Sequence, residues 1–236
     1  MGGGNGVTME EDAYRQARER MVESQLRPRG IASKKVLDVM REMPRHAFVS
    51  VEERGVAYED GALPRREGQT ISQPFMVAVM TQELQLAPGH QVLELGTGTG
   101  YQTAILARLV PEGRVYTIER VASLTALAQK ALLGLEITNV RYYVGDGTAG
   151  WPDEYWDQDG PVAFDRILVT AGAPEVPQPL VRQLRDGGAL VVPVGPRDLQ
   201  TRVRVERRGG QTIETRLLDC RFVPLVGEFG WRRNDE

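Results

Sequence analysis

Short apolar runs alternate with amphipathic segments through the middle of the chain. Five runs have the length and composition of buried strands, and they cover residues 91–95, 114–118, 140–144, 164–170 and 189–194. Between these runs, apolar residues at helical spacing predict helices over residues 101–110, 121–133 and about 179–184. Strands that alternate with helices indicate βαβ units. The pattern therefore predicts an α/β protein with a doubly wound, mostly parallel sheet that is covered on both faces.

The two ends of the chain have different patterns. Three helices are predicted before the first strand: residues 10–26, a segment that starts after Ser33 and stops at Pro44, and a segment that begins near Pro74. Residues 51–68 are charged and contain glycine, which predicts a loop. Near the C-terminus, residues 202–206 and 212–218 alternate polar and apolar positions around two glycines, and residues 220–226 form a last strand-like run. We expect an N-terminal helical addition and a C-terminal antiparallel hairpin.

Composition and charge exclude several classes of protein. Of 236 residues, 41% are hydrophobic and 26% are charged, and the formal net charge is −3. These values are typical of a globular protein and exclude a disordered chain. We expect no membrane segment, since no apolar run approaches the ~18 residues that a spanning helix needs. The acidic balance predicts no nucleic-acid partner, and no basic and apolar leader opens the chain, so we expect a cytoplasmic location.

Cysteine and histidine are too rare for most metal sites. Cys220 is the single cysteine, and His46 and His90 are the only histidines. One cysteine excludes an internal disulfide and any multi-cysteine metal site, and two histidines exclude a histidine-rich centre. We therefore expect no metal, and we interpret His46 and Cys220 as structural residues. The pattern contains no heptad and no long apolar edge that demands a partner, so we expect a monomer.

The most informative local motif is a glycine-rich loop over residues 94–101, with the sequence ELGTGTGY. It follows a predicted strand and opens a predicted helix, where glycines let the backbone turn and approach a ligand closely. The dinucleotide fingerprint G-x-G-x-x-G/A is not met, because its third glycine falls on Tyr101 or Thr103. An acidic residue two positions before glycines at alternate positions resembles the S-adenosylmethionine motif of class I methyltransferases.

Two further carboxylates lie at the ends of the next two predicted strands. Glu119 comes 19 residues after Gly100, where a carboxylate can accept hydrogen bonds from ribose hydroxyls. Asp146 ends the third strand, where it can accept from an adenine amino group. Taken singly, Glu119 is equally well a solvated charge and Asp146 a turn residue. Three carboxylates at three successive strand ends favour a nucleoside-type cofactor.

Several segments resemble the protein-L-isoaspartate O-methyltransferase family, and the resemblance covers roughly residues 15–226. The most specific segment is residues 68–78, GQTISQPFMVA. Further matches are residues 21–26 (MVESQL), 43–49 (MPRHAFV), 58–64 (YEDGALP), 169–171 (VTA), 187–188 (GG), 193–195 (PVG) and 222–225 (FVPL). The glycine-rich loop, in contrast, is shared by many methyltransferases.

The resemblance implies a Rossmann-like fold and a repair enzyme. Members of this family transfer a methyl group from S-adenosylmethionine to the free α-carboxylate of an L-isoaspartyl residue, and S-adenosylhomocysteine is the product. The ester then closes to a succinimide, which reopens partly to normal aspartate. D-aspartyl residues are implied as weaker substrates. The partners would be proteins and peptides that contain isoaspartyl residues.

The resemblance also implies the site residues. Ser72 would be the catalytic group. The cofactor would bind Thr70, Ile71, Ser72, Glu94, Gly96, Thr97, Gly98, Gly100, Glu119, Arg120, Asp146 and Gly147, and the peptide substrate would bind Ser72, Val223, Pro224 and Leu225. Ser72 has an alternative role as the cap of the helix that begins at Pro74. A buried strand is an equally good interpretation of residues 223–225.

The predicted organisation follows from these assignments. Residues 1–8 form a disordered N-terminal end, and residues 9–236 form one methyltransferase domain. Within that domain, residues 9–86 carry the N-terminal helices and the substrate loop, residues 87–200 the cofactor-binding core, and residues 201–236 the C-terminal strands. Two departures from the family pattern are the charged run at residues 65–67 and Gly172, where the family commonly has alanine.

Three other functions compete with this interpretation. A nicotinamide-dependent oxidoreductase would bind NAD and need a proton donor in its pocket. A non-enzymatic binding module would have lost the cofactor carboxylates or Ser72, and all of them are present. A methyltransferase for RNA or a small molecule is disfavoured by the match at residues 69–74.

Overall fold

The computed structural model describes residues 5–64, 70–152 and 163–232. The chain divides into two compact units, Met1–Gln82 and Glu83–Glu236. The expectation of one domain over residues 9–236, with its three parts, stays a prediction. Residues 1–4 of the N-terminal end lie outside the described residues, and a helix begins at Asn5, five residues before the predicted start.

The first unit is mainly helical. Its elements are α1 (Asn5–Met21), a π-helical turn η1 (Val22–Leu26), the 3₁₀ turns η2 (Arg27–Arg29), η3 (Arg45–Phe48) and η4 (Val51–Val56), α2 (Lys34–Glu42), the short antiparallel pair β1 (Leu63–Pro64) and β2 (Thr70–Ile71), and all but the last two residues of α3 (Pro74–Leu84). All three predicted helices are present. Gly30 ends the first helical segment with φ +91°, a conformation that glycine adopts without strain.

The predicted loop over residues 51–68 is wrong in part, because η4 and β1 lie within it. Its last residues fall outside the described part of the chain. Ser50 and Glu53 form a capping box, in which the backbone N–H and the hydroxyl of Ser50 both donate to the Glu53 carboxylate. The S-x-x-E spacing is a known start signal for a helical turn. The loop was predicted because residues 51–68 are charged and contain glycine, and this prediction did not take the S-x-x-E spacing into account.

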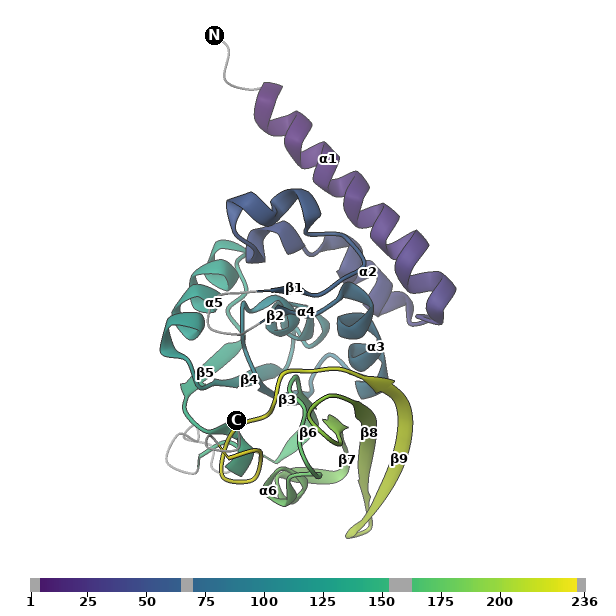
Figure 1. The fold of residues 1–236 in the computed structure, drawn as a ribbon, viewed down its shortest axis with the longest axis vertical. Coiled ribbons are helices and arrows are strands. Elements are labelled where there is room, and N and C mark those ends of the chain that lie inside the picture. The colour runs from purple at the N-terminus through teal and green to yellow at the C-terminus, as the bar shows by residue number, and fades with distance from the viewer. Residues whose placement is uncertain (1–4, 65–69, 153–162, 233–236) are drawn as a thin grey trace. The chain divides into compact units, whose positions relative to one another are not determined.

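The second unit is built on a seven-stranded sheet (Figure 1). Its strands are β3 (Gln91–Leu95), β4 (Arg114–Glu119), β5 (Val140–Val144), β6 (Phe164–Val169), β7 (Leu184–Val194), β8 (Gln200–Arg208) and β9 (Gln211–Cys220), in the order β5-β4-β3-β6-β7-β8-β9. The strands from β5 to β7 pair in parallel, and β8 and β9 are antiparallel. The helices are α4 (Tyr101–Leu109), α5 (Ala122–Gly134), the 3₁₀ turn η6 (Gly147–Ala149) and α6 (Gln178–Arg182). The predicted α/β, doubly wound fold with a C-terminal antiparallel hairpin is confirmed.

The order of the strands determines where a ligand can bind. From β3 the chain proceeds to β4 and β5 on one side, whereas β6 and β7 lie on the other side of β3. The order therefore reverses between β3 and β6. In open α/β sheets, ligands bind beyond the carboxyl ends of the strands at such a reversal. The glycine-rich loop lies there because it follows β3 directly.

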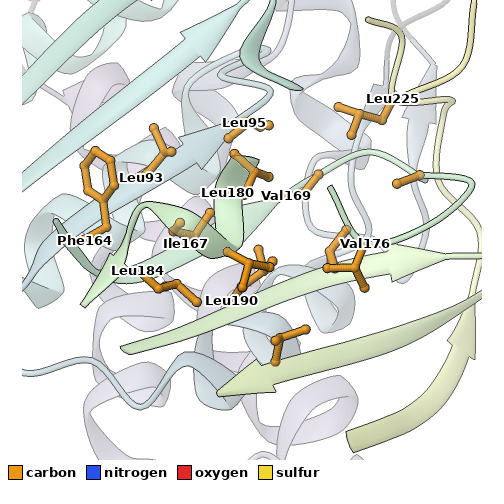
Figure 2. Close-up of a cluster of buried hydrophobic side chains, with 14 of the residues drawn as sticks. Leu93, Leu95, Phe164, Ile167, Val169, Val176, Leu180, Leu184, Leu190 and Leu225 are labelled. Atoms are coloured by element: carbon orange, nitrogen blue, oxygen red, sulfur yellow. The ribbon is translucent and has the colours of Figure 1, made fainter. Parts of the chain in front are cut away.

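Side chains alternate between the two faces of the sheet along β3, so its leucines lie on one face and Glu94 lies on the other. Leu93 and Leu95 point to one face of the sheet, where they join side chains of β6, β7 and α6 in a hydrophobic cluster (Figure 2). Glu94 points to the opposite face, and it accepts a hydrogen bond from Thr103 of α4. Both faces of this central strand are therefore buried, and Glu94 is accommodated there by hydrogen bonds from threonine hydroxyls.

Two predicted boundaries near the C-terminus are wrong. The strand expected at residues 189–194 begins at Leu184, and the preceding helix ends at Arg182. Gly187 (φ +79°) and Gly188 form an irregular start that the apolar pattern does not predict. The hairpin itself is confirmed, with Gly209 (φ +57°) and Gly210 (φ +79°) at its turn.

No strand covers residues 220–226 among the described residues, so the last predicted strand is wrong; β9 ends at Cys220. Pro224 has no N–H to extend a ladder, and the N–H of Phe222 donates to the side chain of Gln200 instead. Only isolated bridges remain, one between Gly172 and Pro224 and one between Val226 and Trp231.

Candidate active site

The glycine-rich loop after β3 needs glycine at two positions for different steric reasons. Gly96, Gly98 and Gly100 all have positive φ, at +97°, +53° and +88°. A Cβ at Gly96 would lie 2.3 Å from the hydroxyl oxygen of Thr170. A Cβ at Gly100 would lie 2.7 Å from a methyl carbon of Leu132 on α5. These two glycines allow the loop to pack closely against its neighbours.

Gly98 differs, because a Cβ there would meet no atom closer than 4.0 Å. One side of this residue therefore borders open space, as a ligand cradle requires. Its backbone N–H donates to Oε2 of Glu119 at 3.0 Å. The structure thus joins the loop after β3 to the carboxylate at the end of β4.

Glu119 is a preorganised acceptor at the edge of the sheet. The residue is 7% exposed, and its other oxygen, Oε1, accepts from the backbone N–H of Val121 at 3.0 Å. A carboxylate has about four acceptor positions, so the two backbone bonds leave about two for a ligand. This is the number that a ribose diol needs. Arg120, the next residue, is exposed.

Asp146 lies after β5 and caps the turn η6. Its Oδ1 accepts from the backbone N–H of Thr148 at 2.8 Å and from the Thr148 hydroxyl at 2.7 Å. Gly147 is buried, and a Cβ there would lie 2.9 Å from Leu95. The backbone N–H of Gly145 donates to the carbonyl of Glu119 at 3.0 Å. The two strand ends that carry carboxylates are therefore tied together.

Glu94 is not presented to a ligand in the same way. Its side chain is fully buried, and Oε2 accepts from the hydroxyls of Thr103 (2.5 Å) and Thr117 (2.7 Å). The Thr117 hydroxyl also lies 2.7 Å from that of Thr97 in the loop. Within the described residues, Oε1 of Glu94 has no hydrogen-bond partner. Glu94 therefore stabilises the loop through buried threonine hydroxyls. Its predicted contact with the cofactor stays a prediction.

Burial raises the pKa of Glu94 to about 7, and the nearby Glu119 charge adds to the rise. The unfolded chain would titrate near 4.5. The native state therefore prefers the protonated acid. Its contribution to stability is complete below pH 4.5 and is lost as the pH rises through about 7.

We expect Glu94→Gln to remove this pH dependence. Between pH 4.5 and 7, the free energy of unfolding of the wild type should fall relative to the variant by on the order of 3 kcal/mol. Urea unfolding of both proteins at four pH values in this window measures the difference. A difference that stays constant with pH would show that Glu94 is ionised throughout.

In the first unit, the segment around Ser72 is held by its backbone and its neighbours. The carbonyl of Ser72 accepts from Nη2 of Arg45 at 2.9 Å, and Arg45, which is fully buried, also donates to the carbonyl of Ala57 at 2.7 Å. Gln73 donates to the carboxylate of Asp60 at 2.7 Å, and Arg29 pairs with the same carboxylate at 3.1 Å. Two segments of the predicted family pattern, residues 58–64 and 68–78, are therefore in direct contact.

The geometry places Gln73, rather than Ser72, at the cap of α3. The carbonyl of Gln73 accepts from the N–H of Val77 at 3.1 Å, which is the first helical bond, and Pro74 takes the first helical position. Ser72 precedes this cap and is half-buried. Ile71 is buried, whereas the side chain of Thr70 and the charged run at residues 65–67 lie outside the described part of the structure.

Residues 223–225 are bound to the turn after β6. The N–H of Gly172 donates to the carbonyl of Val223, and the N–H of Leu225 donates to the carbonyl of Gly172, both at 2.8 Å. Leu225 is buried in the hydrophobic cluster, and Pro224 is exposed. A Cβ at Gly172 would lie 2.9 Å from the buried side chain of Gln200, so this chain's departure from alanine follows from its own packing.

Sequence reasoning missed four threonines that support the site. Thr103 and Thr117 hold Glu94, Thr148 holds Asp146, and Thr170 donates to the carbonyls of Leu95 and Gly96 at 2.8 and 3.0 Å. Thr170 lies in a segment that carries the family resemblance, directly after β6. Thr170 could have been identified from the sequence, because it directly follows the strand that lies beside the point where the strand order reverses. The other three act through side-chain bonds that no spacing rule predicts.

A family model described as "Protein-L-isoaspartate(D-aspartate) O-methyltransferase (PCMT)" matches residues 16–230. The chain belongs to this family. Membership confirms the sequence-based prediction of an S-adenosylmethionine-dependent methyltransferase that acts on L-isoaspartyl residues in protein repair. The match also covers the glycine-rich loop, the three carboxylates, Ser72 and residues 223–225.

Two relatives can be aligned with this chain over nearly their whole length. Protein-L-isoaspartate O-methyltransferases from Trichlorobacter lovleyi and Methanoculleus marisnigri are 51% and 47% identical, over 92% and 95% of this chain and 97% and 98% of their own. A solved protein-L-isoaspartate O-methyltransferase has a TM-score of 0.78 at 30% identity, over 90% of this chain and 67% of its own.

A second solved structure, described as a beta-aspartate methyltransferase from Plasmodium falciparum in complex with S-adenosyl-L-homocysteine, has a TM-score of 0.74 at 25% identity. The match covers 90% of this chain and 98% of that one. In the described residues of this chain, no group of three or more His, Cys, Asp or Glu side chains could hold a metal ion. Across the same residues, no helix is both long and apolar enough to span a membrane.

Proposed function

We propose that this methyltransferase acts on the free α-carboxylate of the isoaspartyl residue and that its second unit holds the cofactor along the carboxyl ends of β3, β4 and β5. The observation that carries the proposal is the link between Gly98 and Glu119, because it puts an open glycine backbone next to a buried carboxylate with spare acceptor positions. Asp146 supplies an acceptor for an adenine amino group, and the N–H of Gly147 is the adjacent donor.

The residues present fit S-adenosylmethionine on chemical grounds. Its ribose diol matches the two acceptor positions left on Glu119, and the space beside Gly98 admits a ligand. When bound, S-adenosylmethionine supplies a methyl group on a positively charged sulfur, and nearby carboxylates favour a cation. The predicted contacts of Thr70, Ile71, Ser72, Glu94, Gly96, Thr97, Gly100 and Arg120 with the cofactor are part of the same proposal.

Ser72 acts on the substrate carboxylate in this proposal. Its hydroxyl donates a hydrogen bond and orients one carboxylate oxygen for attack. A carboxylate with a reference pKa near ~4 is already ionised at neutral pH, so the chain does not need a general base. Positioning of this kind can lower a barrier by ~7–11 kcal/mol. Excluding water helps further, because transfer brings opposite charges together and neutralises them.

His46 has a structural setting that agrees with this mechanism. Its Nδ1 lies 2.6 Å from the hydroxyl of Tyr58, and its ring stacks on Tyr14 with centroids 3.8 Å apart. Burial lowers the pKa of His46 from 6.5. These contacts occupy one ring nitrogen and one ring face. A general base would have to keep its acceptor nitrogen available to substrate.

Residues 223–225 are proposed to bind the peptide substrate. Their bonds to Gly172 leave the carbonyl of the exposed Pro224 on the other side of the segment, where an extended peptide can donate to it. Succinimide closure of the ester then starts repair, and D-aspartyl residues are weaker substrates in this proposal.

The monomer and the cytoplasmic location also remain proposals. Among the described residues, β9 pairs with β8 alone, and its exposed side chains include the charged Glu214 and Arg216 as well as Ile213 and Leu218. Charges along an edge strand discourage pairing with a second chain, which supports a monomer. Sedimentation that shows a dimer at micromolar concentration would contradict it.

Transfer of a radiolabelled methyl group to a synthetic isoaspartyl peptide tests the proposed function, with the normal aspartyl peptide as its matched control. We expect labelling of the first peptide only, and the label should be lost in mild base, as from an ester. Equal labelling of both peptides would overturn the substrate assignment. Thermal-shift measurements with S-adenosylhomocysteine and NAD test the rival oxidoreductase, for which only NAD would stabilise the protein.

A further inference from the structure

The segment after β9 returns to the adenine side of the proposed cofactor site. In Figure 1 it is the yellow trace that ends at the label C. Its backbone contacts Asp146 and Thr148 directly. The N–H of Glu228 donates to Oδ2 of Asp146 at 2.8 Å, and the N–H of Phe229 donates to the Thr148 hydroxyl at 3.0 Å. We call residues 227–231 the C-terminal clamp.

The clamp is itself bound to the segment 223–225 and to the turn after β6. The N–H of Trp231 donates to the carbonyl of Leu225 at 2.7 Å, and the N–H of Gly227 donates to the carbonyl of Trp231 at 3.1 Å. The indole N–H of Trp231 donates to the carbonyl of Gly172 at 3.0 Å, and the Arg197 guanidinium lies 4.8 Å from the centre of a Trp231 ring. The clamp is therefore a closed loop with a defined position.

Together these bonds fix the direction of the Asp146 carboxylate. Of about four acceptor positions, Thr148 takes two on Oδ1 and Glu228 takes one on Oδ2. About one position remains, on Oδ2, and Asp146 is exposed, so a ligand can reach it. An adenine amino group needs one acceptor. The clamp therefore leaves one acceptor position on Oδ2 of Asp146 available and fixes the direction in which it points.

Gly227 is the position in the clamp where a side chain would meet the Asp146 carboxylate. A Cβ there would lie 2.1 Å from Oδ1 and 2.6 Å from Oδ2 of Asp146. No backbone atom is among its three nearest contacts, all of which belong to that carboxylate. The least costly way to relieve the clash is to turn the Asp146 side chain. A single methyl group would therefore redirect the carboxylate rather than unfold the segment.

We propose that Gly227, Thr148 and the backbone N–H of Glu228 are positioning residues for adenine recognition, acting through Asp146. The inference rests on the proposed function only in assigning Asp146 to the adenine amino group. It adds that the C-terminal clamp, from a distant part of the sequence, determines whether that group is recognised.

The test compares two ligands, S-adenosylhomocysteine and its analogue with purine in place of adenine, which lacks the amino group. Calorimetry on the full chain should show that the wild type prefers the first ligand by roughly 10–100-fold, the value of one hydrogen bond to a charged group. In Gly227→Ala, binding of S-adenosylhomocysteine should weaken by a similar factor and binding of the analogue should not change, so the preference disappears. Glu228→Gln keeps the backbone N–H and should retain the preference.

A second pair of variants separates positioning from stability. Thr148→Val removes the hydroxyl that joins Asp146 to Phe229, and it should lose the preference. Thr148→Ser keeps the hydroxyl and should retain the preference, although both variants lower the melting temperature. If Gly227→Ala does not fold, this pair decides the question.

Folded Gly227→Ala or Thr148→Val protein with the wild-type preference would overturn the inference. A wild type that binds both ligands equally would overturn the inference together with the adenine role of Asp146. Methyl transfer to the isoaspartyl peptide would still stand as an independent result in that case.

Discussion

Replacing Ser72 with alanine is expected to lower kcat roughly 10–1,000-fold, the range seen when one preorganised hydrogen-bond donor is lost. The bond that acts in catalysis goes to the substrate carboxylate, so the affinity for S-adenosylhomocysteine should change far less than kcat. The fold should persist as well, because the cap of α3 is the carbonyl of Gln73 and because Arg45 binds the carbonyl of Ser72, which alanine retains. Peptide kinetics, calorimetry and a melting curve on one preparation measure all three quantities.

Ser33→Ala is the matched control, since Ser33 precedes α2 and makes no side-chain cap bond. It should have near-normal kcat. If the Ser72 hydroxyl only supported the fold, Ser72→Ala would instead lose stability and keep its turnover. That result would remove Ser72 from the catalytic site.

The pH profile of kcat tests the absence of a general base. We expect loss of rate only near the pKa of the substrate carboxylate, ~4. A limb closer to neutrality would point to Glu94, whose pKa is raised to about 7, or to a histidine such as His46, whose pKa is lowered by burial. Glu94→Gln separates them. A limb that persists in Glu94→Gln and disappears in a His46 variant would contradict the mechanism without a base.

The parallel core of the fold was predictable because short strand-like runs alternate with segments of helical periodicity. Residues 91–95 and 140–144 were predicted with the observed bounds, since each is a short run rich in β-branched, aromatic or leucine residues between turn signals. The start of β7 was not predictable in this way. Arg185, Asp186 and two glycines occupy it, and it pairs with β6 irregularly, so neither periodicity nor propensity marks it.

The site was predictable where its residues follow the ends of strands. Glu119 and Asp146 could be located because consecutive parallel strands bring their carboxyl ends to one edge. Glu94 shows the limit of the same reasoning. As the penultimate residue of β3 it points into the sheet's packed face, and two threonine hydroxyls take the oxygen that the motif appeared to offer to a ligand.

The clamp on Asp146 could not be predicted at all. Residues 227–231 follow a strand that was expected to run to residue 226, and no periodicity connects them with a turn some 80 positions earlier. Their contacts with Asp146 and Thr148 use backbone N–H groups, which every residue except proline has, so side-chain identity carries no signal there. Gly227 and Gly230 are informative, because a missing side chain often marks a close approach of two segments.

Replacing Glu119 with alanine is expected to weaken S-adenosylhomocysteine binding by roughly 2–4 kcal/mol, which is about 30–1,000-fold. The loss has two parts. The variant lacks the acceptors for the ribose diol, and it also releases the N–H groups of Gly98 and Val121 that organise the loop. Glu214→Ala on the exposed strand β9 is the control, since it removes a carboxylate of the same type far from these bonds in the sequence.

The two parts can be separated with a ligand that lacks one ribose hydroxyl. The wild type should bind 2′-deoxy-S-adenosylhomocysteine more weakly than the parent ligand, whereas Glu119→Ala should bind both equally weakly, because the acceptor for that hydroxyl is gone. If Glu119 only organised the loop, Glu119→Ala would lose affinity for both ligands by the same factor and keep the wild-type ratio between them. The ratio of the two dissociation constants, compared between wild type and variant, therefore decides whether this carboxylate binds ribose or only supports the backbone of Gly98.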